Sequence, residues 1–285
     1  MNKTYRVAGH TFQVCGEQLC KAVEQIVGFR PFECEEGEPL FEFVEGTEVP
    51  VMEKVQYTFS YEDVTGTFGR SEDGFYLHLK PAEEEPFHLW TKEGHPQVML
   101  FGNWSMRLYR FALWVGFGLM TLPYDTVAIH SSCIVYKNKA YLFLGESGTG
   151  KSTHTRLWRE NIEGVVLLND DSPMIRVEEG KVWAYGSPWS GKTPCYKQEH
   201  YPLQAIVRLS QAPHNRMRRL RAVEAIGALL PSLPPAFAFD KELEDATLNT
   251  LSALLRGAKV YHLECLPDAD AARVSYETVF GNETK

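Results

Sequence analysis

The sequence has six cysteines but no C-x-x-C pair, and the six are scattered along 285 residues. This absence argues against a zinc cluster or a disulfide framework and favours reduced, intracellular thiols. The first residues contain no apolar segment of the kind that forms a signal peptide. The longest apolar run, at 111–123, is too short to span a bilayer and is expected to form a buried helix. We therefore expect a cytoplasmic protein without a membrane span.

Basic residues are scarce in the N-terminal part of the chain. Residues 1–100 contain 8 Lys/Arg and 18 Asp/Glu, whereas the whole chain has a net charge of −8. This acidic stretch argues against a nucleic-acid-binding surface there, and a solvated surface accounts for its charge. Because the remaining residues are close to neutral, the sequence predicts two domains, 1–104 and 105–285.

Sequence periodicity predicts a different architecture for each domain. Between residues 40 and 103, short aromatic runs alternate partly with polar residues and are separated by turn residues. With a strand pair expected around Gly9 and a helix at 17–28, these runs predict a mainly antiparallel β module over 1–104. After residue 104, strands alternate with helices, which predicts an α/β domain with a mixed sheet. The arginines at 216–221 could bind a phosphate or an acidic partner, but a solvated loop and helix start is the favoured interpretation. Helices are expected at 105–120, 153–161, 222–233, 240–257 and 268–281.

The most informative motif is GESGTGKST at residues 145–153, which fits the pattern G-x-x-x-x-G-K-[ST]. Its glycines let backbone N–H groups point at phosphate oxygens. Lys151 places a positive charge on the terminal phosphates, and the Ser152 hydroxyl can ligate Mg²⁺. A strand-like run before the loop and a helical run after it match the required context. The candidate nucleotide-binding residues are Gly145, Glu146, Ser147, Gly148, Thr149, Gly150, Lys151, Ser152 and Thr153.

Acidic, histidine and lysine residues near this loop are further candidates. Asp170 and Asp171 end a predicted strand, where one carboxylate can hold Mg²⁺ and the other can accept a proton from an attacking hydroxyl. His130 precedes a predicted β hairpin and either contacts a phosphate or metal or forms a structural hydrogen bond. Lys192 lies in SPWSGKTP (187–194), which is either a second anion-binding turn or a proline-rich surface loop.

These residues, in this order, resemble the superfamily of HPr kinase/phosphorylase and ATP-dependent phosphoenolpyruvate carboxykinase. The resemblance covers about 125–210 and rests on the histidine before the hairpin, the loop G-x-S-G-x-G-K-[ST] and the Asp-Asp pair. It implies a mixed α/β P-loop core with Lys151 on the β- and γ-phosphates.

The resemblance also implies roles for the residues around the loop. It places Ser152 and Asp171 on the metal, makes Asp170 the candidate base, and brings His130 into the active site. PWSGK is similar to a small subgroup of HPr-kinase-like proteins that are often encoded beside peptide-maturation genes, which adds Lys192 to the catalytic candidates.

Two departures from this superfamily bear on the substrate. Thr153 stands where HPr kinases carry an acidic residue, and no arginine- and glycine-rich loop follows the Asp pair, which argues against HPr as the acceptor. Carboxykinases are much longer, and no set of oxaloacetate-binding residues is visible.

The sequence therefore predicts a kinase that uses ATP (with GTP as an alternative) and Mg²⁺ (with Mn²⁺ as an alternative). It would transfer phosphate to a hydroxyl of a peptide, protein or small metabolite. The competing hypotheses are a nucleotide-binding sensor or assembly protein with little turnover, and a small carboxykinase. The acceptor and the oligomeric state are not predicted.

Overall fold

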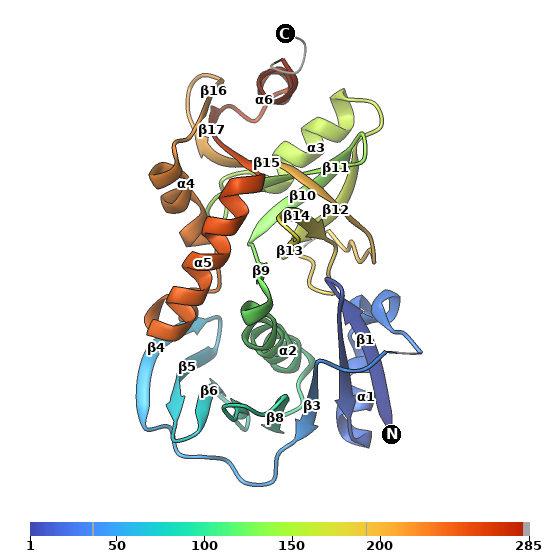
Figure 1. Cartoon of the computed structure of the whole chain (residues 1–285), viewed down its shortest axis with the longest axis vertical. Helices are drawn as coiled ribbons and strands as arrows, with labels where there is room; N and C mark the ends of the chain where they lie inside the picture. Colours follow the sequence, from blue (N-terminus) through green and yellow to red (C-terminus); the bar gives the residue numbers. More distant parts are fainter. Residues whose placement is uncertain (36, 192, 282–285) are drawn as a thin grey trace. The chain divides into compact units, whose positions relative to one another are not determined.

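The computed structural model describes residues 1–35, 37–191 and 193–281, which form two compact units (Figure 1). The first unit contains Met1–Pro123 and Ala236–Ala246, and the second contains Tyr124–Pro235 and Thr247–Lys285. Two segments expected in the second domain therefore count with the first unit. One is helix α2 (Met106–Thr121), and the other is the segment 236–246.

The first unit is built on one mostly antiparallel sheet, as the sequence predicts. Its strand order is β1-β2-β3-β8-β7-β6-β5-β4, and only the pairs β2–β3 and β3–β8 are parallel. Helix α1 (Glu17–Gln25) and a 3₁₀ helix (Val27–Phe32) follow the first hairpin. The strands are β1 (Asn2–Val7), β2 (His10–Cys15), β3 (Phe41–Glu45), β4 (Lys54–Tyr61), β5 (Val64–Ser71), β6 (Gly74–Pro81), β7 (Phe87–Thr91) and β8 (Gln97–Gly102).

Helix α2 belongs with this sheet because its apolar side packs on the sheet's aromatic face. The ring of Phe117 lies 5.8 Å from that of Phe12 and 6.1 Å from that of Phe41. Gly116 faces Phe43 so closely that a Cβ atom there would lie 2.7 Å from the ring. The helix pattern at 105–120 is thus confirmed, and its apolar surface is used within the first unit.

The segment 236–246 is attached to the first unit by a buried carboxylate. Asp240 accepts two hydrogen bonds from Arg70 (both 2.8 Å) and one from Gln56 (2.5 Å). Phe237 packs against Phe68 with ring centroids 6.4 Å apart, and Phe239 stacks on a tyrosine of β4. These contacts explain why so late a stretch of the chain completes the first unit.

The second unit contains a mixed sheet. Strands β12-β10-β11-β15-β17-β16 form its main part, in which β11–β15 and β15–β17 are parallel and the other pairs are antiparallel. The first residues of β15 also pair with β14, which pairs with β13, and β13 in turn pairs with β9. The strands are β9 (Thr126–Ala128), β10 (Ser131–Tyr136), β11 (Lys139–Leu144), β12 (Val166–Asp171), β13 (Met174–Glu178), β14 (Lys181–Tyr185), β15 (His200–Gln211), β16 (Arg216–Arg219) and β17 (Lys259–Cys265).

Helices cover both faces of this main sheet. Tyr141 and Phe143 of β11 pack with helices α3 and α6, whereas Leu142 and Leu144 of the same strand pack with α4 and α5. This division follows from the two-residue period of a strand. The helices are α3 (Lys151–Asn161), α4 (Ala222–Leu229), α5 (Lys241–Gly257) and α6 (Ala269–Phe280), with a 3₁₀ turn at Leu230–Ser232. Two further 3₁₀ turns, Leu122–Tyr124 and Pro235–Phe239, lie mostly in the first unit.

The structure corrects two local expectations. The arginine-rich stretch is not a loop: Arg216–Arg219 forms β16, an edge strand paired with β17. The hairpin turn before the glycine-rich loop uses Lys137 and Asn138, at φ 49° and 58°, whereas the sequence favours Asn138 and Lys139 as its turn residues. Within the described part of the chain, no helix combines the length and apolar character needed to cross a bilayer.

Candidate functional site

The sheet topology brings the predicted site residues to one edge. Strand β10 is antiparallel to both β11 and β12, so these two strands end where β10 begins. The register pairs Ser131 with Leu144 on one side and with Asp171 on the other. The loop after β11, His130 before β10 and the acidic end of β12 therefore meet at the same edge.

The glycine-rich loop connects β11 to α3 and depends on its glycines. Gly150 has φ 101°, a conformation that side-chain-bearing residues rarely adopt, and it directly precedes the helix. A Cβ atom on Gly145 would lie 2.3 Å from Thr149 Oγ1, which itself donates to Glu146 O at 2.8 Å. Ser147 and Gly148 are exposed at the outer part of the loop. This curled backbone is the geometry that a phosphate-binding loop requires.

Lys151 directs its charge into this loop. Its Nζ donates to Gly145 O at 2.8 Å and to Glu146 O at 3.3 Å. Burial lowers the pKa of the Lys151 ammonium, and the nearby carboxylates of Asp171 and Asp170 oppose that shift. A partly desolvated cation held by backbone carbonyls can contact a phosphate at little further desolvation cost.

Asp170 is connected to the loop helix by serine hydroxyls. Only 7% of Asp170 is exposed, and its Oδ1 accepts hydrogen bonds from Ser152 Oγ at 2.9 Å and Ser132 Oγ at 2.7 Å. Ser132 Oγ is also 2.9 Å from Thr155 Oγ1. The Asp170 carboxylate is thus fixed beside the hydroxyl of Ser152.

Asp171 has a different partner. Its Oδ1 lies 3.2 Å from Nδ1 of His130, and the side chains are 34% and 48% exposed, respectively. The backbone N–H of His130 donates to Ser232 O at 2.7 Å, which holds the histidine in position. The two adjacent carboxylates therefore make separate contacts: Asp170 contacts Ser152 and Asp171 contacts His130.

A buried asparagine positions the Asp pair. The amide nitrogen of Asn169 donates to Ser187 O, Ser187 Oγ and Trp189 O at 3.2–3.4 Å. Its Oδ1 accepts from the backbone N–H groups of Asp171 and Ser172 at 3.0 and 2.9 Å. Asn169 thus attaches the segment after β14 to the acidic end of β12.

The segment that carries the predicted Lys192 runs alongside these carboxylates. Gly191 N donates to Asp170 O at 3.1 Å, and Ser190 forms an isolated bridge with Asp171. Lys192 itself lies outside the described residues, so its predicted catalytic role stays a prediction.

Sequence reasoning missed four polar residues near the loop: Ser132, Thr155, Asn169 and Arg208. Arg208, on β15, brings a further cation to within 3.7 Å of the Glu146 carboxylate. Thr155 lies three residues after Ser152, so helical spacing could have indicated it. The other three depend on strand pairing between distant segments, for which a single sequence gives no local signal.

The oxygen atoms at this edge fit a magnesium ion that is shared with phosphates. Ser152 Oγ and Asp170 Oδ1 are hard donors 2.9 Å apart. Among the described residues, no group of three or more His, Cys, Asp or Glu side chains could cage a metal. Mg²⁺ commonly takes one or two protein oxygens and completes its shell with phosphates and water, which agrees with this donor set.

Comparison with known proteins gives a distant structural likeness and no sequence match. No family model matches the chain, and no curated protein matches its sequence. Among solved structures, the chain is similar to the Hpr(Ser) kinase/phosphatase from Coxiella burnetii at 13% sequence identity and a TM-score of 0.31. That match covers 55% of this chain and 95% of the other. The strand pairing described above, and not this match, establishes the mixed α/β architecture.

Proposed function

We propose that the protein is a Mg²⁺-dependent phosphotransferase that moves the γ-phosphate of a nucleoside triphosphate to a hydroxyl group. One observation carries this proposal: Asp170 is hydrogen-bonded to Ser152 of the loop, while its neighbour Asp171 is paired with His130. This arrangement supports the proposal because it brings the loop, a carboxylate that could hold a metal and a pair that could accept a proton to one edge. Phosphoryl transfer needs these groups mainly for positioning and charge neutralisation.

The loop side of the site would bind the phosphates. Lys151 and the loop N–H groups would hold the β- and γ-phosphate oxygens, and Ser152 and Asp170 would hold Mg²⁺. When bound, the metal supplies positive charge that offsets the charge on the transferring phosphoryl group.

The His130–Asp171 pair would accept the proton. As the acceptor oxygen attacks, its bond to the γ-phosphorus forms, the bond from that phosphorus to the β–γ bridging oxygen breaks, and the hydroxyl proton passes to the pair. This proposal exchanges the two aspartate roles expected from the sequence. Its support is that Asp170 is buried against serine hydroxyls, whereas Asp171 is more exposed and contacts the His130 imidazole.

Lys151→Ala tests the site directly. The wild-type protein, labelled ATP, Mg²⁺ and lysate from its source should yield a labelled acceptor, and the variant should lose at least about 100-fold of that rate. Lys181→Ala, at an exposed position of the same unit, is the matched control. Transfer by Lys151→Ala near the wild-type rate would show that the site assignment is wrong.

The same assay separates the competing hypotheses. Tight ATP binding with no labelled product favours a nucleotide-binding sensor. Formation of phosphoenolpyruvate from oxaloacetate and ATP would identify a carboxykinase instead.

A further inference from the structure

The arginine-rich strand β16 forms an open edge of the sheet in the second unit. Among the strands in the described part of the chain, it pairs only with β17, in a register that runs from Arg216–Glu264 to Arg219–Tyr261. An edge strand presents N–H and C=O groups on its outer side, and another extended chain can pair with them. The side chains of β16 decide which kind of chain can do so.

The backbone of β16 has an outer side that the hydrogen bonding identifies. Leu220 N donates to Val260 O at 2.9 Å, which continues the antiparallel register of β16 and β17. Because such a ladder alternates, Arg218 also directs its backbone groups toward β17, whereas Met217 and Arg219 direct theirs away from the sheet. A peptide that adds to this edge would pair with the backbone of Met217 and Arg219.

The side chains of β16 are divided between the two faces of the sheet. Met217 packs with the apolar cluster under α3 and α6, and Leu220 packs with the cluster under α4 and α5. By the two-residue period of a strand, Arg219 shares the face of Met217, and Arg216 and Arg218 share the face of Leu220. Both faces of this edge therefore carry positive charge.

Two of these arginines have no carboxylate partner within the described ranges. Arg218 donates to the Glu224 carboxylate of α4 at 2.8 Å. Arg216 and Arg219 are exposed, and neither forms an ion pair with a residue that the structure describes. Val223, next to Glu224 on α4, is 84% exposed and offers an apolar contact. Guanidinium groups placed in this way attract carboxylates and repel other cations.

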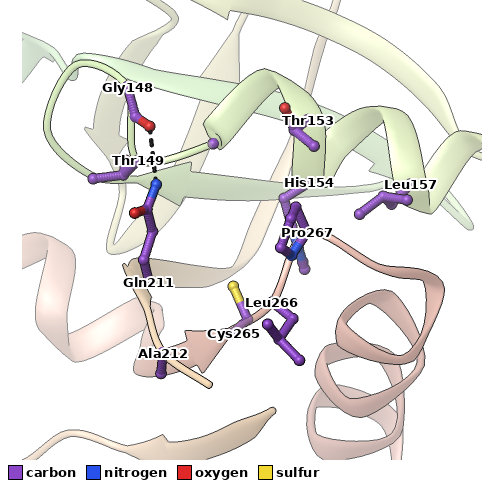
Figure 2. A pocket seen from close by; sticks show the side chains of 11 residues that line it. Gly148, Thr149, Thr153, His154, Leu157, Gln211, Ala212, Cys265, Leu266 and Pro267 are labelled. Atoms are coloured by element: carbon purple, nitrogen blue, oxygen red, sulfur yellow. Dashed lines mark hydrogen bonds between the residues drawn. The ribbon is translucent and has the colours of Figure 1, made fainter. Parts of the chain in front are cut away.

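The start of β16 lies at the same edge of the sheet as the glycine-rich loop. Gln211 ends β15 and donates from Nε2 to Gly148 O at 3.3 Å, and Ala212 follows at the beginning of the connection to β16 (Figure 2). Because β16 runs antiparallel to β17, its first residue, Arg216, lies at the carboxyl end of β17. A chain bound along β16 would therefore have one end at the edge that carries the loop.

These observations favour an acidic, extended peptide as the occupant. A second copy of β16 would place arginines opposite arginines, and like charges directly opposite each other destabilise a strand pair. A nucleic acid would leave the outward backbone groups of Met217 and Arg219 without strand partners, and it would meet a chain of net charge −8. A peptide strand with carboxylates satisfies both the backbone and the arginines.

We propose that β16 is a docking strand that binds an acidic, extended segment of a partner protein by strand addition. The backbone of that segment pairs with Met217 and Arg219, and its carboxylates contact the guanidinium groups of Arg216 and Arg219. This inference is independent of the phosphotransferase reaction, because it rests on the strand edge and its charge.

Fluorescence anisotropy with the full chain tests this surface. The probe is a short labelled peptide of alternating Glu and Val, which should bind at least about tenfold more tightly than a Lys–Val peptide of the same length. A Glu–Pro peptide has the same charge but cannot form a strand ladder, so it should also bind at least about tenfold more weakly than the probe.

A double variant removes the two arginine charges that lack a carboxylate partner. Arg216→Gln combined with Arg219→Gln should weaken binding of the Glu–Val peptide at least about fivefold, because two cross-strand charge pairs are lost. The matched control combines Arg156→Gln with Arg256→Gln, which removes the same charge from exposed positions of α3 and α5. Its affinity for the peptide should stay within about twofold of the wild type.

Amide hydrogen exchange gives a readout on the wild-type protein that does not depend on a variant folding. The bound Glu–Val peptide should slow exchange at the amides of Met217 and Arg219 at least about tenfold, because these N–H groups become paired. The Leu220 amide already donates to Val260 O, so its exchange should change by less than about twofold.

Contrary results are distinguishable from one another. Equal binding of the Glu–Val and Glu–Pro peptides, or unchanged exchange at Met217 and Arg219, would overturn strand addition. Equal binding of the Glu–Val and Lys–Val peptides, or an unchanged affinity of the double variant, would overturn the role of the arginines. Single-stranded oligothymidine that binds as tightly as the Glu–Val peptide would indicate a general polyanion surface instead.

The partner's identity and the proposed reaction are tested separately. Self-association of the wild-type protein that the Glu–Val peptide reverses would overturn the assignment to a different protein, because the occupant would then be an acidic segment of a second copy. No measurement on β16 uses a nucleotide. Loss of this proposal therefore leaves the phosphotransferase standing, and a failure of phosphate transfer leaves the docking strand standing.

Discussion

Asp170 and Asp171 are adjacent in the sequence but contact different groups. Successive side chains of a strand point to opposite faces, so the first reaches the serine hydroxyls and the second reaches His130. A single Asp-Asp motif can therefore provide a metal ligand and a proton acceptor without placing two negative charges on one partner.

Replacing each carboxylate by an amide should separate these two roles. Asp170→Asn should raise the Mg²⁺ concentration needed for half-maximal ATP turnover, because it removes a charge beside Ser152. Asp171→Asn should keep ATP and Mg²⁺ affinity and lower kcat by about 100-fold or more, because it disrupts the proton acceptor. A magnesium titration of phosphate release measures both. The opposite pattern would restore the assignment in which Asp170 is the base.

His154 is a buried histidine that the structure keeps neutral. Burial lowers its pKa to about 4, and its Nε2 lies 3.2 Å from the Trp158 indole N–H, which can only donate. Ser275 Oγ is 3.1 Å from the same nitrogen. Protonating Nε2 would place its N–H against the indole donor, so the charged form is disfavoured in the folded state.

This arrangement predicts sensitivity to acid. The unfolded histidine binds a proton near pH 6.5, whereas the folded one does so near pH 4, so stability decreases as the pH falls below 6.5. Between pH 7 and pH 5, His154 should account for a loss of about 2 kcal/mol in the free energy of unfolding. In urea unfolding, His154→Gln should lose about 2 kcal/mol less than the wild type between pH 7 and pH 5. His95→Gln, at an exposed position, should match the wild type, and an unchanged slope in His154→Gln would contradict this account.

At the level of elements, local signals predicted the strand–loop–helix around GESGTGKST and most of the helices. The sequence also favours a hairpin turn at Glu179 and Gly180, and the structure has its sharp turn there, with φ 49° and 74°. The strand β16 was missed because its arginines show no apolar alternation, and pairing with β17 decides its conformation. Likewise, no local pattern could show that Asn169 contacts Ser187 and Trp189, because those contacts depend on the fold of β13 and β14.

Asn169, which directly precedes the acidic pair, should contribute both to stability and to activity. Asn169→Ala removes several buried hydrogen bonds and leaves backbone N–H groups of the Asp turn without their acceptor, which should cost about 2–3 kcal/mol of unfolding free energy. Phosphate release should fall with it, because the Asp turn loses its support. Asn161→Ala, which removes a hydrogen bond to Leu157 O near the end of α3, is the control. Equal stability of the two variants would argue against this positioning role.

At the level of the whole molecule, the carboxylate of Asp240 fixes a late segment of the chain to the first unit. Burial alone would raise the pKa of Asp240, but hydrogen bonds from Arg70 and Gln56 outweigh it and hold the pKa well below its ordinary range. The side chain is only 4% exposed, so the pair is shielded from solvent. Its contribution to stability is present above about pH 4 and is lost as the pH falls further.

Asp240→Asn should therefore destabilise the first unit by about 3 kcal/mol, because it leaves the Arg70 guanidinium without its main partner. Glu242→Gln is the matched control: this second partner of Arg70 is 68% exposed, and its loss should cost less than about 1 kcal/mol. Urea unfolding at pH 7, followed by near-ultraviolet circular dichroism, measures both. Equal effects of the two variants would show that burial does not set the strength of the Asp240 contact.

The position of this late segment also determines the order in which the protein can be completed during translation. Residues 1–123 leave the ribosome first, yet residues 236–246 must follow before the first unit is whole. At ordinary elongation rates of about 5–20 residues per second, that interval lasts roughly 6–25 seconds. Throughout it, Arg70 lacks the Asp240 carboxylate and Phe68 lacks its contact with Phe237. The part of the first unit that is synthesised first thus depends on a segment that begins only at residue 236, and its nascent form is where we expect a need for chaperones.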